Sequence, residues 1–143
     1  MTKTLFSVVL AALLLLPVTP FAAQPSADQP AVAKEKPGLT IARGVVARSV
    51  EKRDAVGVAE TFPPDVGNVV FFTEIKNNPQ PTTITHVWSY KGKVMAEVSL
   101  KVEGSTWRTW SQKRILPEWT GEWKVEAKSA DGAVLAAKDF TVK

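Results

Sequence analysis

The chain has 143 residues, of which 45% are hydrophobic, and this size and composition predict one globular domain. It contains no cysteine, which excludes disulfides, a thiol nucleophile and zinc sites built on thiolates. The formal net charge is only +4, and the basic residues are scattered among acids, so no nucleic-acid partner is expected.

The first 23 residues have the order of a secretory signal peptide. Lys3 precedes an apolar run at residues 5–16, and the small residues Ala22 and Ala23 follow. The run is shorter than the roughly 20 residues needed to cross a bilayer, so we expect cleavage and export to the periplasm or the exterior. Membrane attachment is expected only if this segment stays uncleaved. Residues 24–38 (QPSADQPAVAKEKPG) have no apolar periodicity and predict a disordered linker.

Residues 39–143 form the predicted folded domain, in which segments rich in Val, Thr, Phe and Trp lie between turn signals. The predicted strands are residues 39–49, 68–75, 82–89, 93–102, 106–113, 122–129 and 134–142. Seven short strands predict an all-β fold of the immunoglobulin-like antiparallel β-sandwich kind. Residues 53–66 contain two adjacent prolines and are predicted to be a loop.

Hydrophobic alternation predicts which strands have one wet face. Residues 94–102 alternate between apolar and mostly polar positions, and so do residues 122–128, as expected for strands with one face in the core. Residues 69–72 (VVFF) are apolar on both faces, which indicates a central strand or an edge hidden by a neighbouring segment.

The hairpin at residues 89–93 decides which way His86 and Trp88 point. A two-residue loop would pair Tyr90 with Lys93 and turn Trp88 to water. A three-residue loop would pair Ser89 with Lys93 and turn Trp88 and His86 to the core. We favour the second register because it leaves a mostly polar outer surface. Trp88 is then a core tryptophan and His86 a partly buried, hydrogen-bonded ring.

The segment WRTWSQK at residues 107–113 supplies the predicted binding residues. Trp107 and Trp110 point to opposite faces of a regular strand, so one of them lies outside. Arg108 shares a face with Trp110, and a guanidinium beside an indole suits a sugar ring, a carboxylate or a peptide. The same pair could instead form a surface plug without a ligand. Trp119 is expected in a loop, where it caps the sandwich or lines a groove.

The order of several short runs resembles a known family. These runs are IAR at 41–43, VVFFTE at 69–74, THVW at 85–88, WRTWSQK at 107–113, WTGEW at 119–123 and FTV at 140–142. Together they resemble the bacterial domain-of-unknown-function family twenty-nine fourteen. The resemblance implies an exported or membrane-tethered module without an established activity. The chain departs from the family at residues 53–55, where a turn proline is expected. The positions that the resemblance marks are His86, Trp88, Arg108, Trp110, Ser111 and Lys113.

An enzyme is the less favoured prediction. A nucleophilic triad would have to use His86, the chain's single histidine, with a serine such as Ser111 and a carboxylate such as Glu97. The sequence has no nucleophile elbow and no metal-ligand spacing, so we expect neither a metal nor another cofactor.

We therefore predict a non-catalytic accessory module of the cell envelope. It would bind an envelope protein or a glycan through an aromatic and arginine-lined surface. A glycan or envelope polymer predicts an exposed groove that holds Arg108, Trp110 and Trp119, whereas a protein partner predicts an exposed strand edge or apolar patch instead. The alternative is a small periplasmic hydrolase that uses His86.

Overall fold

The computed structural model describes residues 38–143. The predicted signal peptide and nearly all of the predicted linker lie outside the described residues. Within residues 38–143 no helix is long and apolar enough to cross a membrane.

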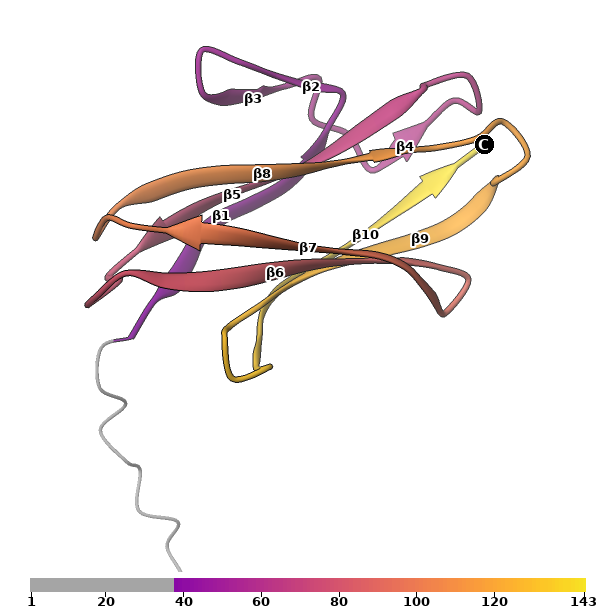
Figure 1. The fold of residues 1–143 in the computed structure, drawn as a ribbon. Coiled ribbons are helices and arrows are strands. Elements are labelled where there is room, and N and C mark those ends of the chain that lie inside the picture. The colour runs from indigo at the N-terminus through magenta and orange to yellow at the C-terminus, as the bar shows by residue number, and fades with distance from the viewer. Residues whose placement is uncertain (1–37) are drawn as a thin grey trace, which may run out of the picture. The chain divides into compact units, whose positions relative to one another are not determined.

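Two sheets pack face to face and form the sandwich (Figure 1). One sheet has the order β1-β5-β8 and the other the order β4-β10-β9-β6-β7, while β2 and β3 form a separate hairpin. The strands are β1 (Thr40–Ala47), β2 (Ser49–Glu51), β3 (Asp54–Val56), β4 (Thr61–Phe62), β5 (Asn68–Lys76), β6 (Thr82–Tyr90), β7 (Lys93–Val102), β8 (Trp107–Arg114), β9 (Gly121–Lys128) and β10 (Val134–Val142). The prediction of an all-β, immunoglobulin-like sandwich is confirmed.

All seven predicted strands are present, but the prediction of a loop at residues 53–66 is wrong in part. This segment contains β3 and β4, and β4 pairs with the end of β10 in parallel. The sandwich is therefore not purely antiparallel. Strands of two or three residues show no period in the sequence, because their pairing depends on a neighbour that is distant along the chain.

The core between the sheets is built largely from aromatic side chains. Trp88 packs edge-on against Phe140 with ring centroids 6.1 Å apart, and Trp123 stacks on Phe140 at 5.9 Å. All three are buried. A buried aromatic ring removes roughly 150–250 Å² from water, which is worth about 4–6 kcal/mol by area. This core supplies the stability that a chain without cysteine cannot obtain from disulfides.

The β6–β7 hairpin differs from the favoured prediction. Tyr90 pairs with Lys93 across a two-residue loop, Lys91 and Gly92, and both loop residues have positive φ (46° and 81°), as in a type I′ turn. The prediction of a three-residue loop is therefore wrong.

A two-residue loop by itself would turn Trp88 to water, but a β-bulge in β7 reverses this direction. Ser89 pairs with Val94 but Trp88 pairs with Ala96, so Met95 is an extra residue on β7. The bulge turns Trp88 and His86 to the core, as predicted, and both are fully buried rather than partly buried. The same shift leaves Val94 53% exposed.

The hairpin β2–β3 covers the outer face of the three-stranded sheet (Figure 1). Phe72 and Val70 point to this outer face, opposite the core, yet both are buried. β2 contacts β5, and β3 contacts β1. The Nη1 atom of Arg43 lies 2.7 Å from Oδ1 of Asp54 in β3. The apolar run at residues 69–72 is thus buried on both sides, because a neighbouring segment hides the second side.

Candidate binding surface

The polar side chains of His86, Trp88 and Ser111 meet inside the core. Ser111 Oγ lies 2.7 Å from His86 Nδ1 and accepts a hydrogen bond from Trp88 Nε1 at 3.0 Å. His86 Nε2 lies 3.3 Å from Thr73 Oγ1, which donates to the carbonyl oxygen of Thr109 at 3.0 Å. These bonds join β6 in one sheet to β5 and β8 in the other.

The hydrogen bonds assign the tautomer of His86. Thr73 Oγ1 gives its proton to the Thr109 carbonyl, so it accepts from the Nε2–H group of His86. Ser111 then donates to the unprotonated Nδ1. Every donor has an acceptor while the ring is neutral. Burial lowers the pKa of His86 from 6.5 to about 4, because the charged ring would lose its hydration.

This arrangement does not have the geometry of a catalytic triad. In a triad, one nitrogen of the histidine contacts the nucleophile and the other contacts a carboxylate. Both nitrogens of His86 face hydroxyl groups, and His86 is fully buried. Burial also leaves Trp88 and Ser111 almost no surface with which to contact a ligand. These three residues therefore bind each other, whereas the sequence analysis placed them among the ligand-binding residues.

Lys113 and Trp119 belong to a cluster at one end of the sandwich. The Nζ atom of Lys113 lies 5.0 Å from the centre of the Trp119 ring, and that ring packs against Trp123 at 6.0 Å. Trp123 Nε1 donates to the carbonyl oxygen of Trp119 at 3.1 Å. The hydroxyl of Tyr90 donates to the carbonyl oxygen of Thr120 at 2.7 Å. Trp119 thus takes the first role considered for it, a cap on the sandwich.

Trp110 points to solvent, and Trp107 points inward to the core around Ile75, as period two predicts. Trp110 is 37% exposed, which makes it one of the few large apolar residues at the surface of residues 38–143. Its ring lies nearly parallel to the buried Phe72 ring, with centroids 6.3 Å apart. The guanidinium of Arg43 lies over the Phe72 ring, 5.5 Å from its centre. Trp110 is therefore exposed and held in place.

Arg108 does not form the surface plug over Trp110. Its Nε atom lies 3.5 Å from a carboxylate oxygen of Glu74, and its Nη1 atom reaches the carbonyl oxygen of Arg53 in the hairpin at 3.5 Å. Arg108 thus connects β8 to the hairpin and does not cover the solvent-facing side of the Trp110 indole.

Four exposed side chains form a line on the outer face of β8. They are Arg108, Trp110, Gln112 and Arg114, and we call them the β8 face. β8 is an edge strand of its sheet, so one side of the line borders solvent. Gln112 and Arg114 were not among the predicted binding residues, although alternation from Trp110 places both on the same face.

The predicted groove of Arg108, Trp110 and Trp119 is not formed. Trp119 packs with Tyr90 and Trp123 at the sandwich end, whereas Trp110 packs with Phe72 on the outer face. The two tryptophans lie in different clusters. Only the β8 face combines an exposed indole with unburied guanidinium groups, and so it is the candidate binding surface among the described residues.

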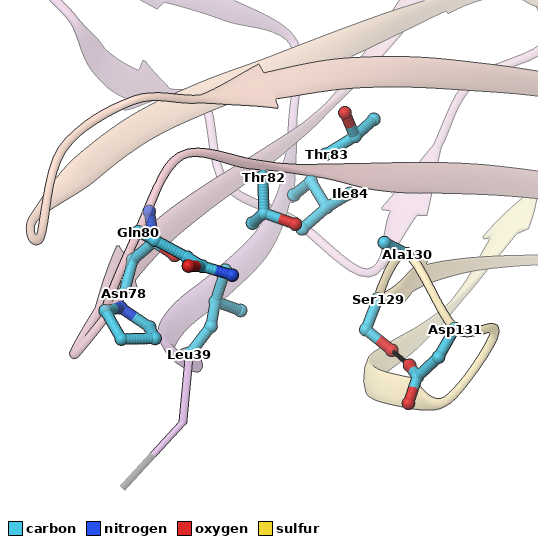
Figure 2. A pocket seen from close by; sticks show the side chains of 10 residues that line it. Leu39, Asn78, Gln80, Thr82, Thr83, Ile84, Ser129, Ala130 and Asp131 are labelled. Atoms are coloured by element: carbon cyan, nitrogen blue, oxygen red, sulfur yellow. Dashed lines mark hydrogen bonds between the residues drawn. The ribbon is translucent and has the colours of Figure 1, made fainter.

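A separate cavity of about 260 Å³ opens between the start of β1, the β5–β6 connection and the β9–β10 turn (Figure 2). Its lining is Leu39, Asn78, Pro79, Gln80, Thr82, Thr83, Ile84, Ser129, Ala130 and Asp131. Ser129 donates to Asp131, and this hydrogen bond lowers the pKa of Asp131. That bond holds the turn together. None of the predicted site residues lines the cavity.

The chain is similar to known proteins over part of its length. Residues 81–142 match the family described as "Protein of unknown function (DUF2914)", which confirms the predicted resemblance over that part of the chain. No curated protein matches the chain. Among solved structures, the chain is similar to a β-glucosidase from Kluyveromyces marxianus, with 14% identity and a TM-score of 0.42. The match covers 74% of this chain and only 14% of that enzyme, so it says nothing about activity.

Proposed function

We propose that this chain, which matches DUF2914 over residues 81–142, is a non-catalytic exported accessory module that binds a cell-envelope component through the β8 face. The exposure of Trp110 carries this proposal. Large indoles are rarely left at a surface without a partner, and aromatic and arginine side chains dominate binding energy at interfaces. Trp110 is also held against Phe72, so little side-chain entropy is lost when a ligand binds.

The hydrolase alternative has less support. A hydrolytic histidine must contact the reacting group, and it works best with a pKa near the operating pH. His86 has no solvent-exposed surface, and burial lowers its pKa to about 4. The His86 network fits a structural role between the two sheets.

Binding to insoluble cell-envelope material in a sedimentation assay tests the proposal. The purified protein should sediment with the envelope fraction, and Trp110→Ala should weaken this retention by about tenfold, since an interface hot spot costs roughly 1–2 kcal/mol or more. Val134→Ala is the matched control, because Val134 is 54% exposed and lies on the other sheet. Equal retention of both variants and the parent protein would refute the β8 face as the binding surface.

Export is tested separately. Fractionation of cells that produce the chain, with N-terminal sequencing, should find the protein outside the cytoplasm with a new N-terminus near residue 24. A protein that keeps Met1 and stays in the cytoplasm would refute the exported role.

A further inference from the structure

We infer that the ligand of the β8 face is a linear acidic polysaccharide, whose carboxylate groups bind to the arginines near Trp110. This inference rests on the proposed function and names the class of ligand.

The arginines of the chain are segregated to one side of the fold. All five lie on β1, on β8 or in the hairpin region between residues 48 and 57, and none lies in the five-stranded sheet. They are Arg43, Arg48, Arg53, Arg108 and Arg114. The other sheet has only lysines as its basic residues. Arginine differs from lysine in presenting a planar fork that binds carboxylates with two hydrogen bonds.

Three of these guanidiniums are free to bind an anion. Arg43 pairs with Asp54 at 2.7 Å, and Arg108 with Glu74 at 3.5 Å. Arg48, Arg53 and Arg114 form no ion pair within residues 38–143, and all three are exposed. The two ion pairs use Asp54 and Glu74, and the unpaired guanidiniums leave this side with a net positive charge.

The outer face of the five-stranded sheet is nearly balanced in charge. It carries the acids Glu97, Glu122, Glu126 and Asp139 among its lysines. An anionic polymer would meet no net positive charge there and would be attracted to the arginine side. The formal net charge of +4 does not show this asymmetry, because it sums over the whole chain.

The shape of the β8 face favours an extended polymer. Side chains two residues apart on a strand lie roughly 6.6 Å apart, so Arg108, Trp110, Gln112 and Arg114 span about 20 Å in a straight line. The flat indole can stack on a sugar ring, and Gln112 can bond to hydroxyls. The unpaired guanidiniums of Arg114 and of Arg53, whose carbonyl oxygen accepts from Arg108, can bind carboxylates. A lipid surface would require several protruding apolar residues, and the β8 face has one.

Affinity measurements with defined polymers test this inference. Polygalacturonate is the probe, and dextran of similar length is the neutral comparison. We expect polygalacturonate to bind and to lose affinity as salt rises, because salt screens exposed charges. Binding should fall at least tenfold in the double variant Arg53→Gln/Arg114→Gln, which removes two guanidiniums that form no ion pair and leaves the Arg108–Glu74 pair intact. The matched control is Lys93→Gln/Lys101→Gln, which removes the same charge from exposed residues of β7 and should bind as the parent does.

The possible failures are distinguishable. Binding of dextran that needs Trp110 but not the arginines would overturn the acidic class and leave the proposed function intact. Equal losses in the two double variants would overturn the arginine side as the site. Equally tight binding of anionic lipid vesicles or of single-stranded DNA would overturn the assignment to a polysaccharide. Loss of envelope retention in Trp110→Ala without any polymer binding would likewise refute the polysaccharide while it supports the proposed function.

Discussion

The Nδ1 atom of His86 lies 2.7 Å from the Oγ atom of Ser111, and this contact crosses from the five-stranded to the three-stranded sheet. The same serine accepts a hydrogen bond from Trp88. Two polar groups of β6 thus depend on one hydroxyl of β8. Buried polar groups are costly unless they are paired, so this network favours one relative position of the two sheets over others.

Replacing Ser111 with alanine should destabilise the domain by about 2–4 kcal/mol. The substitution leaves two buried groups, Trp88 Nε1–H and His86 Nδ1, without a partner, and each unsatisfied group costs roughly 1–3 kcal/mol. Urea unfolding followed by fluorescence measures the loss. Ser99→Ala, at an exposed position of β7, should change the free energy of unfolding by less than about 0.5 kcal/mol. A Ser111→Ala variant as stable as Ser99→Ala would contradict the network.

The buried His86 should make stability depend on pH in a defined window. Its pKa is about 4 in the folded chain and roughly 6.5 in the unfolded chain. Between these values the unfolded state binds more protons, so the free energy of unfolding falls as pH is lowered from about 6.5 to about 4. The full loss is on the order of 3 kcal/mol, with a slope of up to about 1.4 kcal/mol per pH unit.

The variant His86→Gln isolates this effect. A glutamine can accept from Ser111 and donate to Thr73 but does not titrate, and His86 is the only histidine in the chain. The free energy of unfolding, measured with urea between pH 5 and 6.5, should therefore depend much less on pH in this variant. The hydrogen bond from Arg43 lowers the pKa of Asp54 below 3.8, so that carboxylate titrates outside the window. An unchanged slope in His86→Gln would show that another group is responsible.

Phe72→Ala should cost about 3–5 kcal/mol, the range for truncating a buried aromatic side chain. This cost is unexpected for the outer face of a sandwich, and it arises because Phe72 is fully buried there, next to Trp110 and under the guanidinium of Arg43. The variant should also weaken envelope retention, since Trp110 loses its neighbour. Gln112→Ala, on the same face but exposed, is the control for stability. Near-equal unfolding midpoints for the two variants would mean that Phe72 is not buried in solution.

Fluorescence quenching should separate the five tryptophans. Neutral acrylamide should quench the exposed Trp110 most strongly, while Trp88 and Trp123 stay shielded. Single Trp→Phe substitutions assign the signals, and Trp110→Phe should remove most of the accessible fraction. Loss of that fraction in Trp88→Phe instead would contradict the orientation of β6.

The sequence by itself determined the seven longer strands, the class of fold and the opposite directions of Trp107 and Trp110. Each of these follows from alternation within one segment, because side chains on a strand must point to opposite faces in turn. The pattern at residues 69–72 even indicated that a strand is covered on both sides.

Only the tertiary structure decided which groups meet. His86 contacts Thr73 and Ser111, which are 13 and 25 residues away, and no local period encodes such contacts. The direction of His86 was predicted correctly from an incorrect loop, because the bulge at Met95 shifts the register back by one residue. The separation of Trp119 from Trp110 likewise depends on how β8 and its connection pack against other strands. Alternation fixes the side on which a residue lies, and packing between segments fixes its neighbours.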